Sequence, residues 1–220
     1  MTTDGPTADE DDPGTPDRMI TLTDGVVAIA MTLLALDLRP DVTEVGDASS
    51  SRDLARYFGD HAGQYGAFVL AFAIVAQYWS AHHRLMRGIG RHDAAMVWPN
   101  MLFLFGVTLV PLTTYLTGNF SAPLATTIFA GSMVLMSISL ALMSEIADHR
   151  GLRAHRRDPA ERLRVRGREA VTIAVPLAVA VLTWFMPGSA YLFLLFFVAD
   201  LPGRWLAGRR AARAAVSRPG

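Results

Sequence analysis

The sequence predicts an all-α membrane protein with six transmembrane helices and both termini in the cytoplasm. The 220-residue chain is 51% hydrophobic, with a mean hydropathy of +0.29, which is too apolar for an ordinary soluble domain of this size. Its apolar residues fall in six stretches, each close to the roughly 20 residues that a helix needs to cross a bilayer. The 20 basic residues are all arginines, and they are concentrated in alternate connections between these stretches.

Charged residues and prolines mark the boundaries of the first two predicted spans. Residues 1–17 are acidic and proline-rich, and we predict a disordered tail because they have little apolar surface to bury. The first span follows at about 18–38 and ends before Pro40. A polar loop with a short helix at Arg52–Phe58 leads to the second span at about 62–82, whose end carries the aromatic and histidine residues typical of a membrane interface.

The other four spans are separated by short turns and by one long basic connection. They are predicted at about 94–117, 121–146, 169–186 and 189–207, and a basic C-terminal tail follows at 208–220. Pro99 and Pro111 fall inside the third span, where we expect kinks or locally freed carbonyls.

The arginine distribution predicts the orientation. The second–third connection, the fourth–fifth connection and the C-terminal end carry three, eight and five arginines. The first–second loop carries three, and the third–fourth and fifth–sixth turns carry none. By the positive-inside rule, the termini and the basic connections are cytoplasmic. The arginines at 147–169 are best interpreted as a topology signal that contacts anionic membrane lipid.

Several classes of function are disfavoured by composition. The formal net charge is zero, so the chain lacks the basic field expected of a nucleic-acid-binding protein. With no cysteine, disulfides, thiolate metal sites and cysteine nucleophiles are excluded. No H-E-x-x-H, G-x-S-x-G or paired-aspartate motif occurs in any span, so we expect no enzyme, and no cofactor or metal site.

The first span carries an unusual set of polar residues at its cytoplasmic end. Arg18 and Asp24 lie at the mouth of an apolar run, and ionisable residues in such places are candidates for a functional site. Asp24 lies near the positive end of the helix dipole. Its expected partners are Arg18, Thr21 and the His82/His83 end of the second span, which lie on the same side of the membrane.

Helical periodicity separates two stripes on this span. Leu22, Ile29, Leu33 and Leu36 fall near one line, and Gly25, Ala28, Thr32 and Ala35 lie beside it. A branched stripe next to a small-residue stripe suits close helix packing. Periodicity alone therefore leaves open whether the first span is a packing helix or part of a functional site.

The run R-x-x-x-L-T-D-G-V-V-A-I-A-M-T-L-L-A-L at 18–36 resembles the signature R-x-x-x-F-S-D-G-V-x-A-I-x-x-T-L-L of the transmembrane protein 175 potassium channel family. The segment Tyr78–Leu85 and the third-span residues Asn100 and Leu109–Leu112 are similar to later motifs of that family. The chain departs from the signature at Leu22 and Thr23, where the family has Phe and Ser; the second change keeps a hydroxyl.

This resemblance implies a bacterial, single-repeat subunit in the inner membrane that forms a homotetramer, with the first helices lining a central potassium-conducting pore. Such channels lack a T-V-G-Y-G filter, and this chain has none. By position, Ile29 would form the apolar constriction, Leu33 and Leu36 would follow it, and Thr32 would add a ring of hydroxyls. The implied structural cluster that holds the pore helix comprises Arg18, Thr23, Asp24, Gly25, His83 and Asn100.

A small secondary transporter or a proton-permeable cation pathway is the alternative interpretation. Pro99, Pro111 and Pro176 could kink the helices of a carrier, and Asp24 or His83 could carry a proton. Saturable exchange would indicate a carrier, whereas single-channel steps would indicate a pore.

Overall fold

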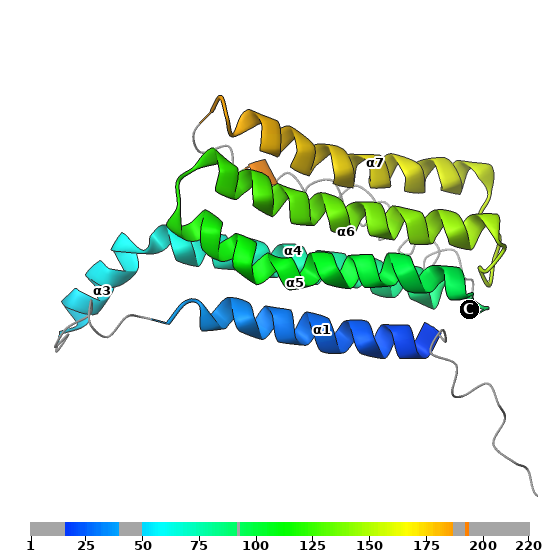
Figure 1. The fold of residues 1–220 in the computed structure, drawn as a ribbon, viewed down its shortest axis with the longest axis horizontal. Coiled ribbons are helices and arrows are strands. Elements are labelled where there is room, and N and C mark those ends of the chain that lie inside the picture. Colours follow the sequence, from blue (N-terminus) through cyan, green and yellow to red (C-terminus); the bar gives the residue numbers. More distant parts are fainter. Residues whose placement is uncertain (1–15, 40–49, 92, 187–191, 194–220) are drawn as a thin grey trace, which may run out of the picture.

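The computed structural model describes residues 16–39, 50–91, 93–186 and 192–193. These residues form long antiparallel helices joined by short loops, as Figure 1 shows, and no strand occurs among them. The elements are α1 (Pro16–Leu36), α3 (Ser51–Asp60), α4 (Ala62–Arg87), the 3-10 turn η1 (Ala94–Met96), α5 (Val97–Asn119), α6 (Pro123–His149) and α7 (Pro159–Leu182). The predicted all-helical class is confirmed. The predicted sixth span lies outside the described residues, apart from residues 192–193, and the predicted C-terminal tail lies wholly outside them. Residues 1–15 of the predicted N-terminal tail are outside them as well.

Local capping explains where two of the helices begin. The predicted short helix in the first loop is α3, where the Ser50 side chain accepts a hydrogen bond from the Asp53 N–H. The helix that carries the fifth predicted span begins at Pro159, ten residues before that span. Asp158 caps it by accepting from the Glu161 N–H at 2.6 Å, and Pro159 occupies the first helical position. The second half of the arginine-rich connection is therefore helical.

Three of the described helical segments are long and apolar enough to cross a membrane: Arg18–Leu36, Ala94–Asn119 and Pro123–His149. The third predicted span is α5, which continues as a helix through both Pro99 and Pro111. Of the remaining long helices, α4 carries the polar residues Gln64 and Gln77 within its apolar stretch, and α7 carries four arginines in its first half. The count of six spans stays a prediction.

The core lies between α1, α4, α5 and α6. Its fully buried side chains include Ile74 and Val75 of α4, Phe103, Val107 and Val110 of α5, and Met133 and Met136 of α6. α7 packs on α6, and α1 packs on α4 and α5. Within the most apolar window of each helix, 28% of the α1 residues are buried, against 50% for the windows of α5 and α6. α1 is thus a membrane-length helix with one side uncovered.

Gly106 permits the close approach of α5 to α6. A Cβ atom at this position would lie 2.7 Å from Met136 Cγ and 3.4 Å from the Ser132 carbonyl oxygen, and Met136 is fully buried. We expect Gly106→Val to lower the free energy of unfolding by about 1–3 kcal/mol through overpacking. Thermal unfolding in detergent, followed by tryptophan fluorescence, measures the effect. Gly131→Val on α6 is the matched control, because a Cβ there has no atom within 4 Å; equal losses in both variants would contradict this account.

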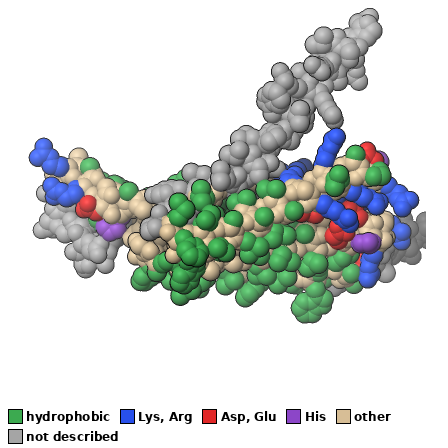
Figure 2. Space-filling model, turned by 90° about the horizontal axis from the view of Figure 1, so that it is seen from above, with side chains coloured by type: hydrophobic (Ala, Val, Ile, Leu, Met, Phe, Trp, Pro, Cys, Tyr) green, Lys and Arg blue, Asp and Glu red, His purple; other side chains and the backbone are tan. Residues whose placement is uncertain are grey.

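Charged side chains gather at one end of the bundle, beside a band of hydrophobic side chains (Figure 2). We call it the basic end: α4 and α6 finish there, α5 and α7 begin there, and Arg84, Arg87, Arg150, Arg153 and Arg157 lie there. Backbone hydrogen bonds join its two loops, from Gly90 N–H to the Leu152 oxygen at 2.8 Å and from Ala154 N–H to the Gly88 oxygen at 3.1 Å. Arg150 also donates to the Asp93 carboxylate at 2.9 and 3.0 Å.

Candidate functional site

α1 has one packed face and one free face. Its buried residues are Met19, Thr23, Val27, Ala30 and Leu34, a spacing of three and four that forms a single helical stripe. On the other side the exposed fractions are 46% for Leu22, 61% for Ile29, 44% for Leu33 and 46% for Leu36. Gly25, Ala28, Thr32 and Ala35 are also exposed. Both stripes derived from periodicity therefore lie on the side of α1 that the rest of the subunit leaves uncovered.

Thr32 has an oxygen available on this free face. Its hydroxyl donates to the Ile29 carbonyl at 2.7 Å, so the proton is engaged within the helix and the oxygen lone pairs remain open to solvent or a cation. Gly25 lies about two turns earlier on the same face and leaves open space there, since a Cβ would meet nothing within 4 Å. The free face thus combines branched apolar side chains with a hydroxyl oxygen.

Asp24 connects α1 to α4. The Trp79 indole N–H donates to Asp24 Oδ1 at 2.7 Å, and the Trp79 ring stacks on His83 with a centroid separation of 5.4 Å and an interplanar angle of 28°. An ionised acceptor makes this hydrogen bond stronger than a neutral one. The arrangement therefore holds the N-terminal half of α1 against the last turns of α4.

A second group of polar side chains lies deeper, where α1, α4 and α5 meet. Asn100 of α5 is fully buried, and its Oδ1 accepts from the Thr23 hydroxyl at 3.4 Å and from His82 Nε2 at 2.7 Å. His82 is 1% exposed and stacks on Phe103 at 5.0 Å. α1 and α4 thus each contribute one buried donor to a shared acceptor on α5, which fixes the register of the three helices.

The predicted structural cluster is divided in the structure. Thr23 and Asn100 lie together, whereas Asp24 reaches His83 only through Trp79. Asn100 is bonded by His82, the neighbour of the residue that we expected there. Gly25 faces outward, and Arg18 lies exposed at the start of α1.

Trp79 and His82 are the two contact residues that the predicted structural cluster left out, although the His82/His83 end of the second span was an expected partner of Asp24. Periodicity held a signal for His82, because it falls four residues after Tyr78 and eight after Ile74, both of which are buried. His83 lies about 100° further around the helix and is only half-buried. No such periodicity pointed to Trp79, because its contact with Asp24 depends on where α1 packs.

We expect Asn100→Leu to destabilise the subunit by about 1–3 kcal/mol, because the buried His82 Nε2 loses its acceptor. Thermal unfolding in detergent tests this. Asn119→Leu is a matched control, since Asn119 is exposed at the other end of α5 and bonds Gln64 there. Replacing both partners, His82→Leu with Asn100→Leu, is expected to cost less than the sum of the single changes; strict additivity would show that the pair is not coupled.

Comparison with known proteins identifies this arrangement. Residues 18–111 match the family model described as endosomal/lysosomal potassium channel TMEM175. A potassium channel of Streptomyces collinus is 31% identical over 127 residues, which cover 56% of this chain and 59% of that relative. A potassium channel of Chamaesiphon minutus is 33% identical over 129 residues, covering 55% and 60%. The endosomal/lysosomal proton channel TMEM175 of Bos taurus is 33% identical over 120 residues, covering 52% and 25%. The matched part of the chain thus spans about three-fifths of the length of the bacterial relatives.

Two solved structures share the fold. The crystal structure of a lysosomal potassium-selective channel TMEM175 homologue from Chamaesiphon minutus superposes with a TM-score of 0.71 at 24% identity, over 85% of this chain and 97% of that one. A variant of the potassium channel MtTMEM175 in complex with a nanobody fusion gives a TM-score of 0.57 at 15% identity, over 89% and 93%. The resemblance predicted from the sequence is confirmed: residues 18–111 are similar to the TMEM175 family, and the chain is a multi-pass membrane protein.

Proposed function

We propose that the chain forms a potassium-selective channel, as a homotetramer in which α1 of each subunit lines a central pore. The free face of α1 is the observation that carries this proposal. A membrane-length helix leaves Ile29, Leu33 and Leu36 exposed in a row, and identical copies of the subunit can cover that face by placing their α1 helices around an axis. The bacterial relatives are named potassium channels.

The pore would run outward from the basic end. α1 begins at that end, and the positive-inside rule makes the basic end cytoplasmic. Arg18 and Asp24 then lie near the cytoplasmic mouth, and Ile29, Leu33 and Leu36 follow at successive turns toward the outside. No carboxylate is placed on the free face between these three residues, so the constriction is apolar.

Selectivity in such a pore comes from its width and from oxygen dipoles. A ring of isoleucines can close by dewetting and can force a passing ion to shed part of its hydration shell. Thr32 oxygens, one from each subunit, can replace some of that water. Potassium loses its shell more easily than sodium because it is larger and less strongly hydrated. The buried contacts of Asn100 and the exposed hydrogen bond between Trp79 and Asp24 serve to hold α1 in place.

Flux into liposomes tests the proposal. Purified full-length protein is reconstituted into liposomes that contain more potassium than the outside solution. Potassium efflux makes the interior negative, protons then enter through an added protonophore, and a pH-sensitive dye reports their entry. We expect a protein-dependent potassium signal and a smaller one when sodium replaces potassium. Equal signals for both ions would contradict selectivity, and saturable exchange without single-channel steps in planar bilayers would indicate a carrier.

Proton permeation through the same pore is a second candidate. The mammalian relatives, including the Bos taurus protein, are named proton channels. A pH-sensitive dye trapped in the liposomes, with no protonophore present, distinguishes the two. A protein-dependent pH change, driven by the voltage that the potassium gradient sets up, would support proton permeation. A potassium flux without a pH change would exclude proton permeation.

A further inference from the structure

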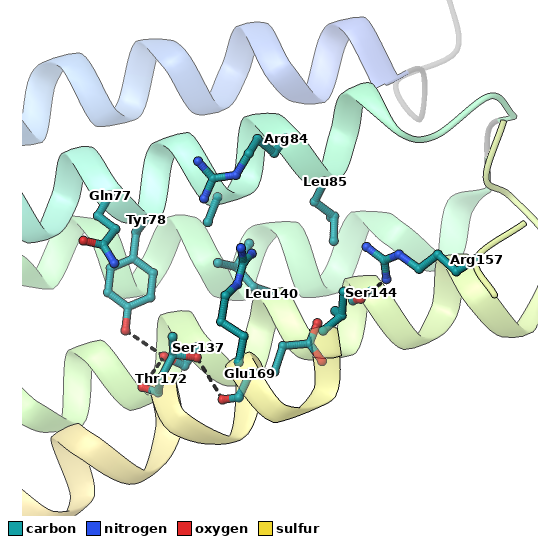
Figure 3. A pocket seen from close by; sticks show the side chains of 13 residues that line it. Gln77, Tyr78, Arg84, Leu85, Ser137, Leu140, Ser144, Arg157, Glu169 and Thr172 are labelled. Atoms are coloured by element: carbon teal, nitrogen blue, oxygen red, sulfur yellow. Dashed lines mark hydrogen bonds between the residues drawn. The ribbon is translucent and has the colours of Figure 1, made fainter. Parts of the chain in front are cut away.

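A cavity of about 240 Å³ lies at the basic end, between α4, α6 and α7, away from the free face of α1. Figure 3 shows Arg84 of α4, Arg157 from the segment before α7, and Glu169 of α7 around it. Arg168 of α7 is the third arginine in its lining. The pore proposed above does not use this cavity.

The lining is positively charged. Three arginines and one glutamate border the cavity, an excess of two positive charges when all four are ionised. Arg84 and Arg168 are exposed at the surface, whereas the Arg157 side chain is 16% exposed. The cavity therefore has an exposed cationic rim and a more buried cation beneath it.

Arg157 is held in place by a network that does not neutralise it fully. Its guanidinium lies 3.3 Å from Asp148 Oδ2 and donates to the Ser144 hydroxyl at 3.2 Å. Arg153 pairs with the same Asp148 carboxylate, so two guanidinium groups share one negative charge. Glu161 is 3.9 Å away, but its side chain is 57% exposed, and water weakens that contribution.

The deeper wall of the cavity is apolar or already hydrogen-bonded. Tyr78 Oη lies 2.7 Å from Ser137 Oγ, and Ser137 donates to the Thr172 carbonyl at 2.9 Å, as the dashed lines in Figure 3 show. Leu85, Leu140 and Val165 complete the wall. A ligand that fits would thus place its charge against the arginine rim and its uncharged part against these side chains.

We propose that this cavity binds a phosphate group, supplied by the head group of an anionic lipid of the cytoplasmic leaflet. Guanidinium groups form charge-assisted, bidentate hydrogen bonds with phosphate oxygens, and basic pockets between membrane helices on the cytoplasmic side are suited to anionic head groups. The proposal rests on the orientation given under Proposed function and not on ion conduction.

Lipid-dependent thermal stability tests the site in the full-length protein. Delipidated protein in detergent is supplemented with phosphatidylglycerol or with the zwitterionic phosphatidylcholine, and the unfolding temperature is measured for each. We expect phosphatidylglycerol to give the larger increase, and we expect Arg84→Gln with Arg168→Gln to remove at least half of that difference. Arg162→Gln with Arg164→Gln is the matched control, because these exposed α7 arginines do not line the cavity.

Inorganic phosphate is the second arm. If phosphate without lipid reproduces the increase in unfolding temperature, and Arg84→Gln with Arg168→Gln abolishes that increase, the cavity binds phosphate, with a soluble anion and not a lipid as the ligand. An equal phosphatidylglycerol effect in wild type and in the Arg84→Gln/Arg168→Gln variant overturns the proposal, and so does an equal loss in the control. If that double variant does not fold, Arg168→Gln alone makes the same comparison, with a smaller expected loss. Flux is not measured here, so a failed channel proposal leaves these outcomes unchanged.

Discussion

Ile29→Asn is expected to raise the potassium conductance and to weaken the preference for potassium over sodium. Ile29 has the largest exposed fraction of the free-face side chains, 61%, and in the proposed tetramer its ring is the apolar constriction. Carboxamide groups in that ring would keep it hydrated and would lower the barrier to a partly hydrated ion. The ion would then cross without the dehydration that separates potassium from sodium.

Single-channel recording in planar bilayers, with reversal potentials under a potassium–sodium gradient, measures both effects. Val69→Asn is the matched control, since Val69 of α4 is 62% exposed and receives the same polar group on a helix that does not line the proposed pore. It should leave conductance and selectivity at wild-type values. Unchanged conductance and selectivity in Ile29→Asn would remove Ile29 from the pore.

Asp24→Ala is expected to reduce the yield of assembled channel far more than the conductance of each channel. The change removes the acceptor of the Trp79 indole N–H, which is 2.7 Å from Asp24 Oδ1. A hydrogen bond to a charged group contributes about 1.5–3 kcal/mol, and we expect the lower part of that range because Asp24 is only half-buried. Since this contact holds α1 on α4, its loss loosens the helix against which the other subunits of the proposed tetramer pack.

Light scattering coupled to size-exclusion chromatography gives the fraction of assembled protein, and bilayer recording gives the conductance of what remains. Asp24→Asn keeps an acceptor oxygen and should retain most of the assembly. Trp79→Phe removes the donor instead and should reproduce the effect of Asp24→Ala. An Asp24→Ala protein that assembles normally but conducts poorly would assign Asp24 to permeation instead of structure.

Helical periodicity was enough to predict which residues share a side of α1, but not that the rest of the subunit leaves that side uncovered. Leu22, Ile29, Leu33 and Leu36 share a side of any α-helix, and the structure exposes all of them. The polar contacts were harder to predict, because adjacent residues such as His82 and His83 differ by 100° around α4 and only the packing on α5 decides which of them reaches Asn100.

The start of α7 shows a different limit. Hydropathy placed a boundary near residue 169, where the apolar run begins, whereas the helix itself begins at its Asp158 cap. A helix can extend beyond the part of it that crosses the membrane, and hydropathy predicts only the membrane-crossing part. The arginines in between became visible as cavity-lining groups only once α4, α6 and α7 were placed together.

The central claim is that the free face of α1 lines the ion pathway, and a single introduced thiol tests it most directly. The chain has no cysteine, so wild type is a background without reactive thiols. In the Ile29→Cys channel, a methanethiosulfonate reagent or cadmium is predicted to block the potassium current, while wild type and Val69→Cys continue to conduct. If the Ile29→Cys thiol is modified completely and the potassium current persists unchanged, α1 does not line the pore.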